Sequence, residues 1–137
     1  MRFPLGDPML VNARVEGEYG AVRELKALID FNAPYCTMLF QDALDLGYPQ
    51  AGNKHADQER LTPELVPRFT EMRGIERGIL FKLHKLSVGS IEVTDVDTVV
   101  LELETPRFIT FDLRLGRSFL KYCKLTVDVG KGYVTLV

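Results

Sequence analysis

The sequence predicts an all-β fold in a single domain spanning residues 1–137. Short runs rich in Val, Ile, Thr, Leu and Phe are separated by Gly, Asn, Asp or Pro, which is the pattern of strands joined by turns. Val88-Gly89-Ser90 and Gly130-Lys131-Gly132 have the composition of tight hairpins, because glycine takes the positive φ that such turns need. The length of 137 residues allows one domain with a hydrophobic core and is short for two.

The expected strands follow one another along most of the chain. Each is apolar or alternating, and most are short and bounded by turn-forming residues. They cover Met9–Glu16, Glu24–Asp30, Thr37–Leu39, Arg68–Met72, Ile79–Leu86, Ile91–Val93, Thr98–Leu103, Phe108–Leu115, Lys124–Val129 and Tyr133–Val137.

Two stretches interrupt this pattern and look helical. In Phe40–Gly47 small and apolar residues recur at i, i+3, i+4 and i+7, and the final glycine is placed to end a helix. Ser118–Tyr122 is a shorter candidate of about one turn. The polar segment Pro49–Pro67 shows no period and is expected to run over the surface. One short helix on a β framework is therefore predicted.

Composition and charge exclude several classes of protein. The chain is 46% hydrophobic and carries a net charge of −2, so it lacks the basic surface of a nucleic-acid binder. The N-terminal MRFPLGDPML is interrupted by prolines and an aspartate, unlike a secretion signal, and no segment reaches the roughly 18 apolar residues of a membrane span. A cytoplasmic protein that binds neither nucleic acid nor membrane is expected.

The cysteines and histidines do not suggest a cofactor. Cys36 and Cys123 lie far apart in apolar surroundings, and we expect buried free thiols rather than a disulfide. With only His55 and His84 and no C-x-x-C, the chain shows no metal-ligand spacing. It also lacks a phosphate-binding loop and a dinucleotide-binding motif. No metal and no cofactor are predicted.

Asp30 is the strongest candidate for chemistry. It ends the apolar run Ala-Leu-Ile and is followed by Phe31, Asn32, Ala33 and Pro34, so a carboxylate is expected beside the core, where its charge needs partners. A structural explanation is an Asx turn, in which the aspartate accepts hydrogen bonds from backbone N–H groups two residues on. Taken alone, Asp30 fits this explanation better than a catalytic role.

A second motif changes that balance. The pairing of LKALIDFNAPYCTMLFQDALDLGY with FDLRLGRSFLKYCKLTVDVGKGYVTL resembles the retropepsin-like aspartic proteases. Those proteins have an apolar strand ending in Asp-Thr/Ser-Gly-Ala, followed later by two apolar residues, Gly and commonly Arg. The resemblance places Asp30 on the catalytic aspartate and Ala33 on the alanine of the first motif, and Gly116 and Arg117 in the second.

The resemblance implies a retropepsin-like barrel with a flap hairpin that works as a homodimer. Each chain would bring one Asp30, and the two carboxylates would share a proton and activate water. The flap tip would be Gly74-Ile75-Glu76-Arg77-Gly78, with Gly74, Ile75 and Gly78 contacting substrate. The same segment is also typical of an ordinary hairpin turn.

Two residues after the aspartate depart from the family pattern. Phe31 replaces the Thr or Ser whose hydroxyl braces the two catalytic turns across the dimer, and phenylalanine cannot make those bonds. Asn32 replaces glycine; asparagine tolerates a positive φ, but its side chain would crowd the approach of a substrate. Both changes predict weakened support for the dyad.

Arg114 is the third departure. Alternation along Leu113-Arg114-Leu115 puts it on the face opposite to its leucine neighbours. If that face borders the cleft, a guanidinium near Asp30 would favour ionised carboxylates, which have no proton to donate. If it lies at a strand edge, the arginine extends into solvent. Arg117 would bond to backbone carbonyls.

The sequence thus supports an aspartic endopeptidase acting as a homodimer on an extended peptide, bound as an added strand. The alternative is a catalytically inactive retropepsin-like dimer that binds a peptide or small anion through Arg114. A purely structural β dimer is a third interpretation, which no residue specifically favours.

Overall fold

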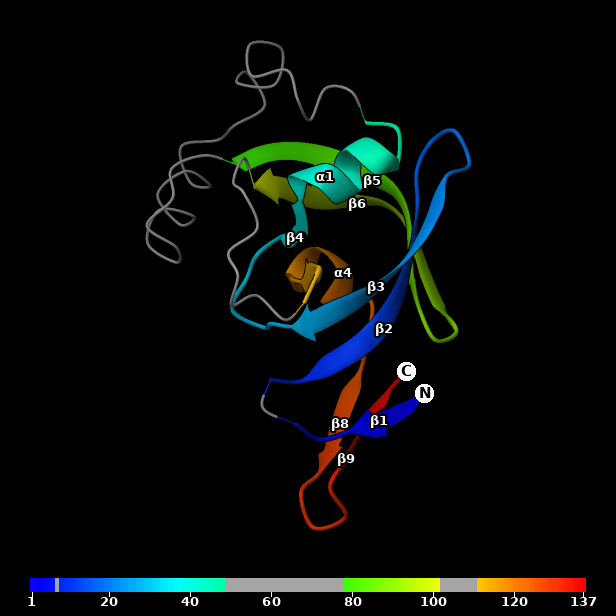
Figure 1. Ribbon diagram of the computed structural model, residues 1–137. Coiled ribbons are helices and arrows are strands. Elements are labelled where there is room, and N and C mark those ends of the chain that lie inside the picture. The colour runs from blue at the N-terminus through cyan, green and yellow to red at the C-terminus, as the bar shows by residue number, and fades with distance from the viewer. Residues whose placement is uncertain (7, 49–77, 102–110) are drawn as a thin grey trace.

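The computed structural model describes residues 1–6, 8–48, 78–101 and 111–137. Six of its strands form a closed barrel in the order β2-β3-β7-β4-β6-β5 (Figure 1). Their bounds are Leu10–Glu16 for β2, Val22–Ile29 for β3, Cys36–Leu39 for β4, Gly78–Val88 for β5, Ile91–Leu101 for β6 and Leu113–Leu115 for β7. The predicted all-β barrel is therefore confirmed.

Side-chain alternation explains how β2 and β3 enter the barrel. Along β2, Val11, Ala13 and Val15 are buried while Asn12 and Arg14 are exposed, as a period of two requires for a strand with one face on the core. The two strands pair in an antiparallel ladder that runs from Leu10↔Leu28 to Glu16↔Val22. Strand β3 ends at Ile29, one residue before Asp30.

A separate three-stranded sheet lies below the barrel in Figure 1. Its order is β1-β9-β8, with β1 at Arg2–Pro4, β9 at Tyr133–Leu136 and β8 at Leu125–Asp128. The short strand β1 was not predicted, because Pro4 ends it; a proline is tolerated there since β1 is an edge strand. The chain's two ends are thereby held side by side, with the Leu136 N–H donating to the Met1 carbonyl at 2.8 Å.

Two short helices are described, where one helix and one turn were expected. Helix α1 covers Phe40–Asp45 and helix α4 covers Arg117–Leu120. The chain leaves α1 through Gly47, whose φ of +90° is accessible to glycine at little cost. The glycine thus ends the helix as its position predicts. Among the helices in the described ranges, none is long and apolar enough to cross a membrane.

The two predicted hairpin turns are confirmed. Gly89 has a φ of +60° and joins β5 to β6, and Gly132 has a φ of +74° and joins β8 to β9. Strand β6 is continuous where two strands were predicted, although Asp95 within it has a φ of +54°. Opposite this position the N–H of His84 donates to the hydroxyl of Tyr48 at 2.8 Å.

Strand β7 covers the last three residues of the predicted strand Phe108–Leu115, and Phe111 and Asp112 before it are not in a strand. It pairs in parallel with β3 and antiparallel with β4, so three residues connect two elements that lie about 80 positions earlier in the chain. Residues 102–110, as well as the predicted elements Pro49–Pro67 and Arg68–Met72, lie outside the described residues. The position of β7 is what completes the surroundings of Asp30.

The core fills the barrel and continues beneath the two helices. Its largest fully buried side chains are Phe119, Met38, Leu46, Leu83, Leu86, Leu113, Leu115 and Leu136. Cys36 and Cys123 are free thiols, the first buried and the second partly buried. Burial raises the pKa of both thiols, which suits a packing role.

Candidate active site around Asp30

Asp30 lies immediately after β3, on a turn whose backbone is held from two directions. Its N–H donates to the carbonyl of Leu115 on β7 at 3.0 Å. One carboxylate oxygen, Oδ1, accepts the N–H of Asn32 at 2.9 Å, which is the Asx turn considered from the sequence. The Asx turn therefore fixes the direction of the carboxylate and does not by itself exclude a chemical role for it.

Helix α4 closes the turn from the other side. The N–H of Arg117 donates to the Ala33 carbonyl at 2.8 Å, and the N–H of Ser118 donates to the Pro34 carbonyl at 3.1 Å. Ala33 is 3% exposed. The side chain of Arg117 is exposed, and the hydrogen bond to the turn comes from its main chain. The two sequence motifs that suggested the family are therefore in direct contact.

Gly116 allows this contact because it has no side chain. A Cβ at this position would lie 2.2 Å from the carbonyl oxygen of Tyr35 and 2.8 Å from that of Ala33. Both distances are far inside van der Waals contact, and both atoms belong to the main chain. The glycine is required by close approach of two backbone segments, since its own φ of −98° is ordinary.

Ser118 is a supporting residue that the sequence did not single out. Its hydroxyl accepts the N–H of Cys36 at 3.0 Å and donates to the carbonyl of Asp97 at 2.7 Å. One side chain thus joins α4 to β4 and β6. A serine after Gly-Arg carries no distinctive signal in the sequence, because its partners are main-chain groups from distant segments.

Arg114 lies beside Asp30 rather than extending into solvent. Its Nε is 3.6 Å from Oδ2 of Asp30, and the two side chains are 11% and 21% exposed. The guanidinium also lies over the ring of Phe111, with 5.7 Å from its Cζ to the ring centroid. Of the two positions that the sequence left open, the structure has the one that borders Asp30.

Strand register explains this position. Leu28 on β3 pairs with Arg114 on β7, Arg114 pairs with Thr37 on β4, Thr37 pairs with Val99 on β6, and Val99 pairs with Leu80 on β5. Paired residues in a sheet present their side chains to the same face. We call these five residues the cleft row. It lies on the face opposite to the barrel core, and Thr37 and Val99 are 7% and 0% exposed.

The two residues after Asp30 face outward. Phe31 is 48% exposed and Asn32 is also exposed. The positive φ that asparagine was expected to tolerate is not used at Asn32: among the described residues, Asp95 is the non-glycine residue with a positive φ. The turn therefore forms without the left-handed conformation, and Phe31 presents an apolar surface next to the carboxylate.

The predicted flap tip falls mostly outside the described residues. Gly74 and Ile75 lie there, and Gly78 is the first residue of β5. Substrate contacts of Gly74, Ile75 and Gly78 remain predictions.

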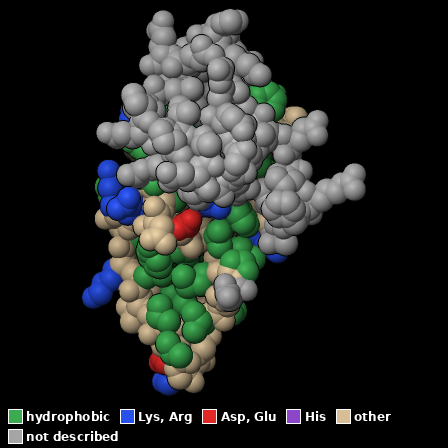
Figure 2. All heavy atoms as spheres, turned by 90° about the vertical axis from the view of Figure 1, so that its left-hand side faces the viewer, with side chains coloured by type: hydrophobic (Ala, Val, Ile, Leu, Met, Phe, Trp, Pro, Cys, Tyr) green, Lys and Arg blue, Asp and Glu red, His purple; other side chains and the backbone are tan. Residues whose placement is uncertain are grey.

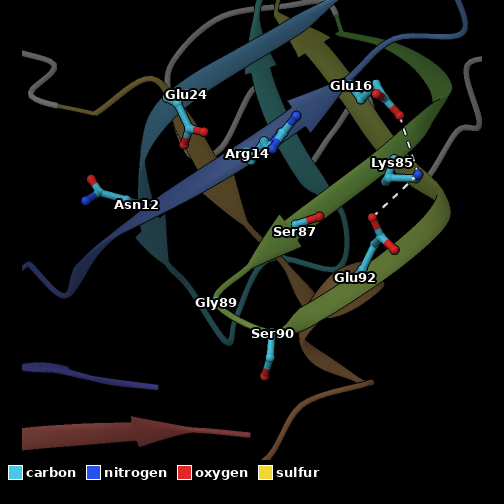
Figure 3. A pocket seen from close by; sticks show the side chains of 9 residues that line it. All are labelled: Asn12, Arg14, Glu16, Glu24, Lys85, Ser87, Gly89, Ser90 and Glu92. Atoms are coloured by element: carbon cyan, nitrogen blue, oxygen red, sulfur yellow. Dashed lines mark ion pairs between the residues drawn. The ribbon is translucent and has the colours of Figure 1, made fainter. Parts of the chain in front are cut away.

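A hollow of about 560 Å³ lies on the outer surface of β2, β5 and β6 and contains none of the predicted site residues (Figure 3). Its charges are largely paired with one another: Lys85 lies 3.5 Å from both Glu16 and Glu92. Figure 3 shows this lysine between the two glutamates. Mutually paired surface charges of this kind are typical of a solvated strand face.

Comparison with known proteins supports the fold. No family model and no curated protein matches the sequence. The structure is similar to a crystal structure of a retropepsin-like aspartic protease from Rickettsia conorii, with a TM-score of 0.60 and 17% identity over 99% of this chain and 88% of that chain. It is also similar to the retroviral protease-like domain of Ddi1 from Leishmania major, with a TM-score of 0.53 and 15% identity over 94% and 87% of the two chains. The retropepsin-like fold expected from the two motifs is therefore confirmed.

Proposed function

We propose that this chain, which has the retropepsin-like fold, is an aspartic endopeptidase that acts as a homodimer. The observation that carries the proposal is the placement of Asp30. Its carboxylate is partly exposed, and its turn is braced at the main chain by Leu115, Arg117 and Ser118. Because this carboxylate is rigidly held at the surface of the chain, the Asp30 carboxylate of a second chain can pack against it.

The chemistry requires that second copy because a single chain supplies one carboxylate. Two Asp30 side chains brought together about a two-fold axis would not both ionise easily, so they would hold one proton between them. The ionised member would take a proton from water, and the protonated member would donate to the substrate carbonyl. An extended peptide would bind as an added strand, with its side chains in alternate pockets.

Exposed apolar side chains on the three-stranded sheet support dimer formation. Figure 2 shows apolar side chains gathered over the lower part of one face, at the height where Figure 1 places β1, β8 and β9. Strand β8 is an edge of its sheet and includes Val127, which is 45% exposed, and Val129 follows at 76%. Phe31, which follows Asp30, is also exposed, so a self-complementary partner would meet apolar side chains both at the Asp30 turn and on the three-stranded sheet.

The ion pair between Asp30 and Arg114 favours a second candidate function. Nε of Arg114 lies 3.6 Å from Oδ2 of Asp30, and a carboxylate that is engaged by a guanidinium is less available to act on water. In that case the dimer would bind a peptide or a small anion without hydrolysis. The same contact would have to loosen during catalysis in the enzyme.

A cleavage assay separates the two functions. Purified protein is incubated with a peptide library from mildly acidic to neutral pH, beside Asp30→Asn and Arg114→Ile variants. We expect cleavage by the wild type and a loss of at least about 1000-fold in Asp30→Asn, since the amide cannot activate water. The asparagine retains an oxygen that can accept the Asn32 N–H, so the turn should stay folded.

The other outcomes are equally informative. No cleavage by the wild type, together with cleavage by Arg114→Ile, would show that the arginine disables an otherwise competent pair of carboxylates. Cleavage that persists undiminished in Asp30→Asn would refute the aspartic mechanism.

A further inference from the structure

Phe31 lies at the tip of a turn that the rest of the chain holds on both sides. Before it, the Asp30 N–H donates to the Leu115 carbonyl at 3.0 Å, and after it the Ala33 carbonyl accepts a main-chain N–H of α4 at 2.8 Å. Oδ1 of Asp30 also accepts the N–H of Asn32 at 2.9 Å. Hydrogen bonds within one chain therefore fix the main chain at residue 31 relative to the Asp30 carboxylate.

The ring of Phe31 is left uncovered by its own chain. Phe31 is 48% exposed, whereas the other phenylalanines in the described part of the chain are buried or half-buried. Burial of an apolar ring against another apolar surface is favourable, because it removes the ring from water. Single exposed apolar residues are common, so the position of this one carries the argument. It lies one residue from the proposed catalytic acid, where the proposed function needs a second chain.

Two-fold symmetry specifies what covers the ring. In a symmetric dimer, residues near the axis contact their own copies in the partner, whereas residues far from the axis contact different residues. The proposed function brings the two Asp30 carboxylates together at the axis. Consecutive Cα atoms are about 3.8 Å apart across a trans peptide bond, so Phe31 lies close to the same axis. Its ring can therefore reach the partner subunit's Phe31.

We propose that Phe31 is a positioning residue of the dimer, whose ring packs against the partner subunit's Phe31 across the two-fold axis. The proposal rests on the proposed function in placing Asp30 at that axis. Two rings in an offset or edge-to-face arrangement fix the distance between the two turns. Because each turn holds its own carboxylate, the pair of rings also sets the separation of the two Asp30 side chains.

The first test measures the dimer Kd by analytical ultracentrifugation and does not depend on cleavage. Phe31→Ala should raise the Kd about tenfold or more, and Phe31→Leu, which keeps a large apolar side chain, should raise it less. The matched control is Tyr19→Ala, because Tyr19 is an aromatic residue that is 83% exposed on the hairpin at the opposite end of β3 from Asp30. The control should have the Kd of wild type.

The second test measures whether the two copies of residue 31 lie side by side. Phe31→Cys is combined with Cys123→Ser, which leaves Cys36 as a buried native thiol. Dissolved oxygen, with copper–phenanthroline as catalyst, takes two electrons and two protons from two thiols, and one disulfide forms. Because a disulfide needs Cβ atoms about 3.5–4.5 Å apart, a covalent dimer on a non-reducing gel reports close approach. Oxidation is carried out above the dimer Kd of the variant, and Tyr19→Cys in the same background should give no covalent dimer.

The third measurement separates a dimer contact from a role in the fold of one chain. Because Phe31 is exposed at the tip of its turn, Phe31→Ala should leave the free energy of unfolding of the monomer unchanged. Urea denaturation is followed below the dimer Kd of wild type. A large loss of stability would show that Phe31 packs within its own chain and would overturn the proposal.

The outcomes distinguish this contact from the peptidase. A wild type that stays monomeric at high concentration rejects the proposed function and the contact with it. A wild-type dimer whose Kd is unaffected by Phe31→Ala, or in which Phe31→Cys forms no disulfide, rejects the contact and leaves the dimer standing. A raised Kd together with the disulfide upholds the contact even where no peptide is cleaved, and in that case the peptidase alone is rejected.

Discussion

Gly116 shows how one missing side chain can determine the geometry of a site. The main chains of the Asp30 turn and of the start of α4 approach so closely that a Cβ on residue 116 would overlap two carbonyl oxygens. These carbonyls cannot move aside cheaply, because the Ala33 carbonyl already accepts the N–H of Arg117. A substitution would have to separate the two segments and with them the support of Asp30.

Gly116→Ala should therefore destabilise the protein by about 2 kcal/mol or more, as overpacking against rigid main chain does. The free energy of unfolding is measured by urea denaturation. Gly130→Ala is the matched control, because a Cβ there would meet nothing nearer than Oδ1 of Asp128 at 3.7 Å. We expect the control to stay within about 0.5 kcal/mol of wild type. Equal effects of the two substitutions would show that backbone contact at Gly116 is not the reason for the glycine.

Helix α1 is attached to β3 by charges that respond to pH. Arg23 of β3 lies 3.5 Å from Asp42 and also pairs with Asp45. Burial raises the pKa of Asp42, and the nearby Arg23 opposes the shift. Because the folded pKa is above the unfolded one, the neutral carboxyl stabilises the fold. That contribution is complete below the unfolded pKa and is lost as the pH rises through the folded pKa.

Asp42→Asn should remove this loss, since the amide is uncharged at every pH. Relative to wild type, the variant should gain up to about 1 kcal/mol of unfolding free energy between about pH 4 and neutral pH. Urea denaturation over that pH range measures the difference. Asp45→Asn serves as the control, because it removes the more exposed partner of the same arginine. Parallel pH profiles of wild type and Asp42→Asn would contradict the assignment.

At the level of elements, most strands were predicted well, and β1 and β7 were the exceptions. Alternating side chains in β2 and β3 and glycines at the β5–β6 and β8–β9 turns gave bounds within one or two residues. Strand β1 was missed because Pro4, its last residue, argues against a strand and is tolerated there only because β1 is an edge. Phe111 and Asp112 of the predicted strand Phe108–Leu115 are not in a strand, although the Asp112 N–H donates to the Lys26 carbonyl at 2.8 Å. Pairing partners, which decide such cases, are not a local property.

For the whole molecule, we predict that the proposed dimer buries Val127 and Val129 against the partner chain. Wild type should sediment as a dimer at micromolar concentration. Val127→Lys and Val129→Lys should each raise the dimer Kd about tenfold or more, because an unpaired ammonium would be buried on association. Tyr19→Lys is the control: this residue is 83% exposed on the β2–β3 hairpin and should not affect association. A strict monomer at high concentration would end both the peptidase and the inactive-dimer proposals.

The candidate site was predictable in part because its two motifs are local. Asp30 and Gly116 can be recognised from their neighbours in sequence, and the structure places their segments in contact. The side of β7 that Arg114 occupies was left open, since it depends on register with β3 and β4. Thr37 and Ser118 were missed because each interacts with residues that are distant in the chain: Thr37 pairs with Arg114, and the Ser118 hydroxyl donates to the carbonyl of Asp97.

Because β7 lies late in the chain, the Asp30 turn can be held in place only near the end of synthesis. β3 and β4 leave the ribosome long before residues 113–118, which supply the carbonyl for the Asp30 N–H and the amides for the turn. Until then the barrel cannot close and the carboxylate is not held in place. A nascent or truncated chain that lacks residues 113–118 therefore cannot hold Asp30 in the geometry on which the proposed hydrolysis depends.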